Sequence, residues 1–308
     1  MYKLYNNKQF YFPNASFINS IDNVHIFEMK NYRIGMHKQE FFEINIITRG
    51  KGKHYIEENE MDANVGDVFI IPPEVAHGYT GGEGFDVCHI TINNSFMQKN
   101  LADLQNIEGF SVLFNVEPLI RARTNKHLHL KLNDEQFKEV YEILEKNIGR
   151  GRFTTSSIAF KNIGTFFLLV TILCEIYSES LGANSEKSSS SDAAFMKAIA
   201  LIHERYAEKL TLDMLANEAR LSKSSFMRRF VYICKMPPAE YIIKKRIEVA
   251  ETILKNTNAS LFEIAEQVGF YDTAHLSRTF KKIKGVTPSE FRKNLALNNE
   301  AAVSTDEH

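Results

Sequence analysis

The chain has 308 residues, of which 44% are hydrophobic and 24% are charged, and its formal net charge is -1. This composition is typical of a globular protein and excludes a disordered or collagen-like chain, and the length is sufficient for two domains. The three cysteines, Cys88, Cys174 and Cys234, are far apart in the sequence. They match neither a zinc-binding spacing nor a disulfide framework, and they are typical of a reducing compartment.

The charge is unevenly distributed along the chain. Residues 193–295 contain 18 Lys and Arg against 11 Asp and Glu, a balance of +7, whereas residues 1–192 have a balance of -5. A basic C-terminal third indicates that this third contacts a polyanion such as DNA. The first residues show no signal-peptide pattern, and the longest apolar run, Ile163–Cys174, is too short to span a bilayer. We therefore expect a cytoplasmic protein with no membrane contact.

The first part of the chain predicts a small β-barrel. An aromatic-rich arm, residues 1–20, precedes short runs with a period of two between Val24 and Ile92. These runs are VHIFEM, EINIITRG, GKHYIEE, DVFIIPP and DVCHITIN, and Gly or Pro residues separate them. Their spacing predicts an antiparallel barrel or jelly roll over residues 1–132. A barrel of this size can enclose one small ligand.

Two segments of this region, His37–Gly52 and Val65–His77, resemble the two conserved segments of the cupin superfamily. In metal-binding cupins the first segment supplies two His and a Glu, and the second supplies a His. The resemblance places these positions at His37, Gln39, Glu43 and His77, so that a Gln replaces one His ligand. It implies either a transition-metal site of reduced affinity or no cofactor.

Alternatively, these polar residues line a pocket that binds a small effector through convergent hydrogen bonds. The candidate effector-binding residues are His37, Glu43, Arg49, His77 and Tyr79, with His25 and His89 as lesser candidates.

Helical periodicity begins after residue 132. Two amphipathic patterns, Glu135–Ile148 and Thr155–Tyr177, predict an antiparallel hairpin within residues 133–180. The second helix is apolar around most of its circumference, so we expect it to pack on the barrel, on a second copy of the chain, or on both. The Ser-rich residues 181–192 predict a flexible linker, and residues 296–308 predict an acidic, disordered tail.

Residues 193–295 contain an internal repeat of about fifty residues. Each copy has a short helix pattern, a turn and a second helix pattern; Phe226 of the first copy aligns with Leu276, and Phe230 aligns with Phe280. The pattern predicts two helix-turn-helix units in an all-α domain. The helix predicted over Ala239–Lys255 spans roughly 25 Å, which allows one chain to contact two successive major grooves.

Residues on the outer face of each second helix are the candidates for DNA contact. The base-facing candidates are Ser224, Met227 and Arg228 in the first unit and Thr273, Ala274 and Arg278 in the second, and the phosphate candidates are Lys223, Lys281 and Lys282.

This arrangement resembles the AraC/XylS family of bacterial transcription regulators. The spacing from Ala274 to Lys282, Gly285, Pro288, Phe291-Arg292 and Arg246-Ile247 carries the resemblance over residues 193–295. The cupin-like domain and the domain order extend it to nearly the whole chain. The first unit departs from the family pattern: Arg220 and Lys235 replace two turn glycines, and Val231-Tyr232 replaces a basic pair. We therefore expect backbone strain and fewer phosphate contacts in the first unit.

The resemblance implies an effector-controlled, sequence-specific DNA-binding regulator that forms a homodimer. It also implies an activator, which acts on RNA polymerase, rather than a repressor, and a sugar or sugar derivative as the effector. The alternatives are a fatty or aromatic acid, a protein partner, or a metal-dependent cupin enzyme fused to a DNA-binding module. No second acid–base constellation supports an enzyme, so we expect a protein without catalytic residues.

Overall fold

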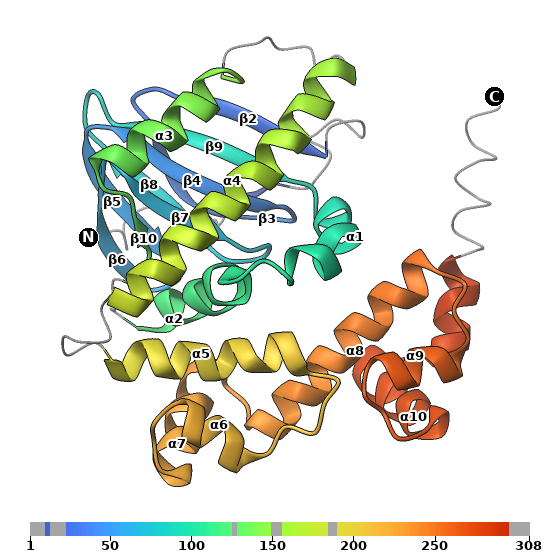
Figure 1. The fold of residues 1–308 in the computed structure, drawn as a ribbon. Helices are drawn as coiled ribbons and strands as arrows, with labels where there is room; N and C mark the ends of the chain where they lie inside the picture. The colour runs from blue at the N-terminus through green and yellow to red at the C-terminus, as the bar shows by residue number, and fades with distance from the viewer. Residues whose placement is uncertain (1–9, 13–22, 125–127, 149–155, 184–189, 296–308) are drawn as a thin grey trace, which may run out of the picture. The chain divides into compact units, whose positions relative to one another are not determined.

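The computed structural model describes residues 10–12, 23–124, 128–148, 156–183 and 190–295. The chain divides into two compact units, Met1–Met196 and Lys197–His308. Figure 1 shows that strands dominate the first unit, whereas the described part of the second unit is helical. The predicted α+β class with two domains is confirmed.

The first unit is built on two five-stranded sheets, with the strand orders β1-β3-β8-β5-β6 and β10-β7-β4-β9-β2. Strand β1 pairs with β3 in parallel, and the other pairs are antiparallel. The strands are β1 (Phe10–Phe12), β2 (Val24–Met29), β3 (Arg33–Gln39), β4 (Phe42–Arg49), β5 (Lys51–Ile56), β6 (Asn59–Asn64), β7 (Asp67–Ile71), β8 (His77–Gly81), β9 (Asp86–Ile92) and β10 (Leu130–Lys131). This arrangement confirms the predicted antiparallel barrel.

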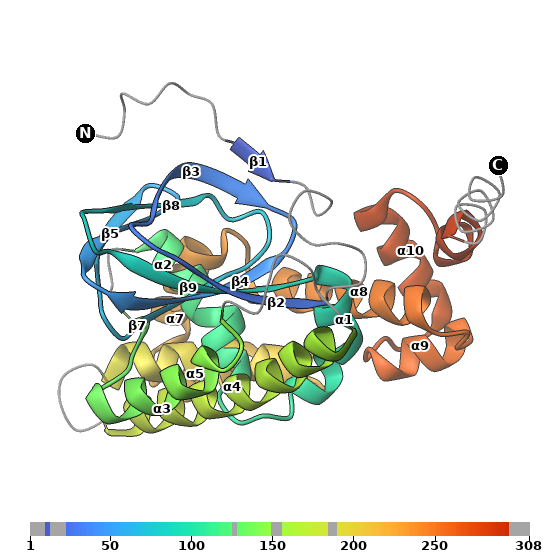
Figure 2. The same cartoon turned by 90° about the horizontal axis from the view of Figure 1, so that it is seen from above.

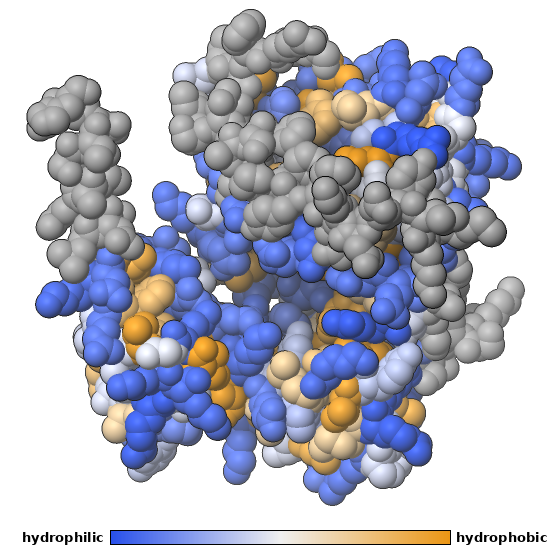
Figure 3. All heavy atoms as spheres, turned by 180° about the vertical axis from the view of Figure 1, so that it is seen from behind, coloured by the Kyte–Doolittle hydropathy of each residue, from blue (hydrophilic) through white to orange (hydrophobic). Residues whose placement is uncertain are grey.

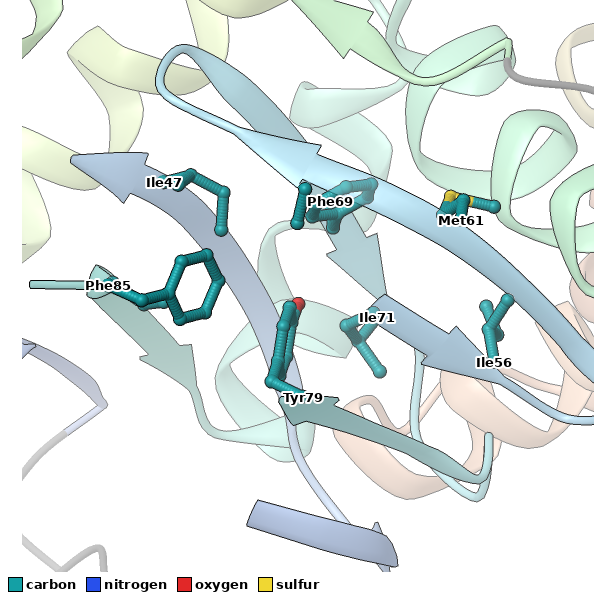
Figure 4. Packing of buried hydrophobic residues seen from close by; sticks show 9 residues of the cluster. Ile47, Ile56, Met61, Phe69, Ile71, Tyr79 and Phe85 are labelled. Atoms are coloured by element: carbon teal, nitrogen blue, oxygen red, sulfur yellow. The ribbon is translucent and has the colours of Figure 1, made fainter. Parts of the chain in front are cut away.

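Apolar side chains fill one part of the space between the sheets. Figure 4 shows Phe69 and Tyr79 pointing into this interior from β7 and β8, with Phe85 beside Ile47. Each of these four side chains is fully buried. Alternation along the strands places every second residue on the inner face. The five runs with a period of two therefore all correspond to strands.

Apart from the short strands β1 and β10, which lie outside Val24–Ile92, three strands were not predicted as strands: β3, β6 and β8. Two of them contain adjacent polar or glycine residues, as in Asn59–Asn64 and His77–Gly81, so the apolar period of two is weak. In β3 the alternation is broken by a register shift between Ile34 and His37. In β3 and β8 the pattern is lost because His37, Gln39 and His77 are buried polar residues, whereas β6 has only two buried apolar residues, Met61 and Ala63.

Helices lie outside the second sheet. The predicted hairpin is formed by α3 (Asp134–Glu145) and α4 (Ser156–Ala183), which cover that sheet on the side away from β3 and β8 (Figure 2). The side chain of Asn162 on α4 donates to the carbonyl oxygen of Val24 on β2 at 3.2 Å. The unpredicted segments α1 (Asn94–Leu104), η3 (Ser111–Val116) and α2 (Glu117–Arg123) lie within residues 1–132, so that stretch is not entirely a barrel.

Helix α4 is longer than the apolar run that suggested it. By length and composition alone, Ser156–Leu181 is long and apolar enough to cross a membrane, so the expectation based on Ile163–Cys174 is corrected. Core helices of soluble proteins have the same length and composition. The contact of α4 with β2, and its fully buried residues Phe166 and Leu173, describe a helix that packs against a sheet.

The predicted linker, residues 181–192, is also corrected at both ends. Helix α4 continues to Ala183, and α5 (Ser190–Arg205) begins inside the Ser-rich stretch. Residues 184–189 lie outside the described residues, as do the acidic tail and the N-terminal arm except for β1.

The second unit contains the two predicted helix-turn-helix units. The first consists of α6 (Leu212–Glu218) and α7 (Lys223–Cys234), the second consists of α9 (Leu261–Gln267) and α10 (Thr273–Lys284), and α8 (Pro238–Asn256) joins them. Helices α6 and α9 have seven residues each, and α7 and α10 have twelve residues each. The 19 residues of α8 span about 28 Å. The internal repeat in the sequence is therefore a repeat of structure.

Candidate ligand site and nucleic-acid interface

A cluster of buried polar side chains lies between the two sheets, beside the apolar core. We call it the polar cluster. Strand β3 contributes His37 and Gln39, β4 contributes Glu43 and Asn45, β8 contributes His77 and Tyr79, and β9 contributes His89. Each of these seven side chains belongs to a residue that is at least 93% buried. The alternation of strands places residues two positions apart on the same face, which explains the pairs His37–Gln39, Glu43–Asn45 and His77–Tyr79.

Glu43 is at the centre of the hydrogen bonds in the polar cluster. The amide nitrogen Nδ2 of Asn45 donates to Oε2 of Glu43 at 3.0 Å, and Nδ2 also lies 3.2 Å from the hydroxyl of Tyr79. Nε2 of His77 lies 3.3 Å from the same carboxylate oxygen. The ring centroids of His37 and His77 are 4.2 Å apart. The structure thus brings together four of the five candidate effector-binding residues.

The electrostatics of the polar cluster favour one ionised carboxylate among neutral rings. Burial lowers the pKa of His37 and of His89 to about 4. Burial by itself raises the pKa of Glu43, but the hydrogen bond with His77, the nearby His89 and the hydrogen bond from Asn45 together lower this pKa to about 2. At neutral pH, Glu43 is therefore ionised, and His37 and His89 are uncharged.

Several polar atoms of the polar cluster are buried and have no hydrogen-bond partner within the described part of the chain. They include both polar atoms of the Gln39 side-chain amide, both ring nitrogens of His89, and Oδ1 of Asn45. A buried polar atom without a partner destabilises the fold by about 1–3 kcal/mol. A ligand with several hydrogen-bonding groups would relieve this penalty.

Arg121 on α2 closes the interior next to the polar cluster. Its guanidinium is fully buried and donates to Glu117 at 2.8 Å, to the carbonyl oxygen of Ile70 at 2.5 Å, and to Nε2 of His54 at 2.9 Å. The ring of His54 stacks between Phe69 and Tyr79, at centroid distances of 4.3 and 4.6 Å. A buried arginine with these three partners is already neutralised and satisfied.

Two sequence-based assignments in the barrel, Arg49 and His25, differ from the structure. The side chain of Arg49 is 70% exposed, and Nε lies 3.8 Å from Asp86, so Arg49 is outside the polar cluster. His25 packs against Phe27 and is only half-buried. The metal site at His37, Gln39, Glu43 and His77 stays a prediction; among the described residues, no group of three or more His, Cys, Asp or Glu is close enough together to hold an ion.

Sequence reasoning missed Asn45, His54 and Arg121. Asn45 could have been found, since it follows Glu43 by two residues in a strand with a period of two. The partnership of His54 with Arg121 joins residues 67 positions apart, and no local pattern predicts it.

The candidate DNA-contact residues lie on the accessible faces of α7 and α10. None of the nine is buried; Met227 and Thr273 are half-buried and the others are exposed, namely Lys223, Ser224, Arg228, Ala274, Arg278, Lys281 and Lys282. The side chains assigned to the core are also confirmed, since Phe226, Phe230, Leu276 and Phe280 are fully buried. Nζ of Lys223 lies 2.6 Å from Oδ1 of Asp213, so this lysine forms an ion pair with α6.

Each helix of the two units begins with a side-chain cap. Thr211, Ser222, Ser260 and Asp272 accept hydrogen bonds from backbone N–H groups in the first turn of α6, α7, α9 and α10, respectively. The caps fix where α7 and α10 begin, and the beginning of the second helix is the part of a helix-turn-helix that enters the major groove. Figure 3 shows that hydrophobic patches on one face of the C-terminal unit are small and lie among hydrophilic residues.

Comparison with known proteins agrees with this division. Residues 24–144 match the family model described as an AraC-like ligand binding domain, and residues 215–294 match the model described as a helix-turn-helix domain. The Msm operon regulatory protein of Streptococcus mutans is 26% identical over 274 residues, which cover 87% of this chain and 90% of that protein. The transcriptional activator RhaR of Mannheimia succiniciproducens is 23% identical over 258 residues, which cover 83% and 86%, respectively.

Among solved structures, ToxT of Vibrio cholerae O395 is 16% identical, covers 88% of this chain and 98% of its own, and superposes with a TM-score of 0.33.

Proposed function

The chain belongs to the AraC family of transcription regulators, which bind DNA, and on this premise we propose that it is a cytoplasmic activator controlled by a neutral, polyhydroxylated effector, a sugar or sugar derivative. The polar cluster is the observation that carries the proposal. Two of the similar proteins, named RhaR and RhaS, are transcriptional activators, which supports activation. The relatives of this chain are regulators rather than enzymes. Among the described residues, no group of three or more His, Cys, Asp or Glu could hold a metal ion.

The hydrogen-bonding capacity of the polar cluster supports a ligand rich in hydroxyl groups. The unpartnered atoms include a donor and an acceptor on Gln39, a donor and an acceptor on the neutral ring of His89, and an acceptor on Asn45. A hydroxyl group both donates and accepts, so adjacent hydroxyls can satisfy such a mixed set. The rings of Tyr79 and His37 would cover the apolar faces of a sugar.

The charge of the polar cluster argues against a fatty or aromatic acid. Glu43 is ionised, and His77 already faces it at 3.3 Å. Arg121, the nearby guanidinium, is paired with Glu117. A ligand carboxylate would therefore bring a second negative charge into a buried site without a cation to pair with it.

Thermal unfolding of the whole chain in a panel of sugars, fatty acids and aromatic acids tests the effector. A sugar present at about 100 times its Kd stabilises the folded state by about 2.7 kcal/mol, which raises the Tm by about 5–10 °C. Glu43→Gln should abolish this shift, and Arg49→Ala, which alters an exposed side chain outside the polar cluster, should retain it. A shift produced by carboxylates and not by sugars would contradict the proposal.

The outer face of α4 supports a homodimer. Phe160 and Leu168 are 75% and 50% exposed, and Gly164 lies between them on the same face, with open space around it. Residues four positions apart form one stripe of a helix, and a glycine in the stripe permits close approach of a second helix. Sedimentation of the whole chain should show a dimer that Phe160→Asp with Leu168→Asp dissociates, whereas Met29→Asp, a change of another exposed hydrophobic residue, should not.

Activation would place RNA polymerase among the partners. Transcription in a purified system with RNA polymerase, this protein and the matching promoter should rise with the effector. The proposed DNA-binding domain, residues 193–295, would bind the promoter without responding to the effector, because it lacks the polar cluster.

A further inference from the structure

The turns of the two helix-turn-helix units differ by one residue. Both turns begin alike, with a residue of positive φ, Arg220 in the first unit and Gly269 in the second. The backbone N–H of the next residue donates to a carbonyl oxygen of the preceding helix. The N···O distance is 2.9 Å from Leu221 to Ala216 and 2.8 Å from Phe270 to Ala265. In the first unit, the cap residue Ser222 follows at once. In the second unit, Tyr271 is inserted before the cap residue Asp272.

Tyr271 is not required by the packing of the second unit. Phe270 is 6% exposed and belongs to the core formed by α8, α9 and α10, and its ring lies 5.0 Å from the ring of His275. Tyr271 is 96% exposed, and within the described residues its side chain makes no hydrogen bond or ring contact. The insertion therefore presents an aromatic side chain to solvent without any gain in burial.

The position of Tyr271 is at the DNA-facing end of α10. In a helix-turn-helix, the N-terminal residues of the second helix approach the base edges, and the residues just before it lie near the sugar–phosphate backbone. Tyr271 precedes the first residue of α10, Thr273, by two positions. A tyrosine hydroxyl is among the groups that donate to phosphate oxygens in protein–DNA complexes.

We propose that the hydroxyl of Tyr271 donates a hydrogen bond to a DNA phosphate beside the groove occupied by α10. The contact depends on DNA binding by the second unit and not on the effector. Because the first unit has no inserted residue, the contact is present in one half of the binding site and absent from the other.

Binding of the whole chain to a duplex selected by that chain from random DNA tests the proposal. Tyr271→Phe should weaken binding about tenfold, the loss of one hydrogen bond to a charged acceptor, without changing the Tm, because the side chain is exposed. Replacement of the contacted phosphate by a neutral methylphosphonate should weaken binding of the wild-type chain by a similar factor and leave the binding of Tyr271→Phe unchanged. Tyr141→Phe is the matched control: it removes a tyrosine hydroxyl from α3, outside the two helix-turn-helix units, so the affinity of this variant should equal that of the wild type.

Equal affinities of the wild type and Tyr271→Phe would overturn the proposal. If in addition Tyr271→Ala bound DNA normally but activated transcription poorly, Tyr271 would contact a protein rather than DNA.

Discussion

The two helix-turn-helix units have the same helix lengths, and each of their helices begins with a side-chain cap, yet the units use different residues at the same two backbone positions. Gly269 and Gly285 of the second unit have φ of 77° and 82°. Arg220 and Lys235 of the first unit occupy the corresponding places with φ of 52° and 60°. The left-handed conformation is therefore imposed by the fold of the unit and not by the glycine.

Packing around the turn explains which unit requires glycine. A Cβ atom at Gly269 would lie 2.1 Å from the carbonyl oxygen of Ala207, because the segment after α5 is held against this turn. Arg246 on α8 holds it by donating to the carbonyl oxygens of Tyr206, Glu208 and Gly269 at 2.7, 2.8 and 2.6 Å. Arg220, in contrast, is exposed. The first turn carries only the conformational penalty, whereas the second also has no space for a side chain.

The largest expected effect comes from giving the second turn a side chain. Gly269→Ala should lower the free energy of unfolding by about 3 kcal/mol, because positive φ and a clash with backbone act together. Gly285→Ala is the matched control: its φ is also positive, but a Cβ there meets nothing within 4 Å, so we expect a loss of about 1 kcal/mol. Denaturant unfolding measures both variants. Equal losses would show that the contact with Ala207 has no role.

The next largest effect concerns the two arginines that occupy corresponding places on α7 and α10. Arg228→Ala and Arg278→Ala should each weaken binding to the selected duplex about 10- to 100-fold and relax base preference in different halves of it. Binding to duplexes with one changed base pair in each half identifies the half affected. If Arg278→Ala retains full specificity, the assignment of α10 as the recognition helix of the second unit is wrong.

A smaller effect should distinguish the C-terminal halves of α7 and α10 by their contacts with phosphate. Lys281 and Lys282 on α10 correspond to Val231 and Tyr232 on α7, so only the second unit has cations there. Lys281→Ala and Lys282→Ala should each reduce the slope of log K against log salt concentration by about 0.9. Val231→Ala should leave the slope unchanged. Equal slopes for all three variants would contradict a stronger phosphate grip by the second unit.

A smaller effect still should come from replacing the two left-handed residues of the first unit with glycine, which should increase stability. Arg220→Gly and Lys235→Gly should each raise the free energy of unfolding by about 0.5–1 kcal/mol. Glycine removes the penalty of the left-handed conformation, but part of this gain is lost because glycine has greater conformational freedom in the unfolded chain. The sign is opposite to that of Gly285→Ala. A loss of stability in Arg220→Gly would mean that the arginine side chain stabilises the turn.

The smallest expected effect is a difference in pH dependence between the first helices. The carboxylate of Glu263 accepts a hydrogen bond from the backbone N–H of Ser260 at 2.7 Å, which lowers the pKa of Glu263 below its ordinary value of 4.5. A lowered carboxyl pKa stabilises the fold above the unfolded-state pKa, and the contribution is lost as the pH falls through the folded-state value.

The stability of the wild type should therefore decrease more steeply below pH 4.5 than that of Glu263→Gln. The first unit has Met214 at the corresponding position of α6, so Met214→Gln should not change the pH profile. Parallel profiles for Glu263→Gln and the wild type would show that the capping carboxylate does not affect stability.

The sequence by itself determined five of the strands, the helical hairpin and the division into a barrel and tandem helix-turn-helix units. It could do so because these features depend on local periodicity: a period of two in DVCHITIN, a helical stripe in α8, and a repeat that aligns Phe230 with Phe280. The same periodicity identified the accessible positions of α7 and α10, since exposure on a helix follows from spacing.

Only the tertiary structure decided which polar residues face the interior of the barrel. Arg49 and Glu43 lie on the same strand, but Arg49 is at its exposed end, whereas Glu43 pairs with β7 and β9 and is buried against His77 of β8. His54 was not predicted, because its partner Arg121 is 67 residues away. Likewise, the requirement for glycine at position 269 depends on Ala207, which no pattern around residue 269 reveals. Contacts between distant segments set burial and charge pairing, and a local pattern contains no information about them.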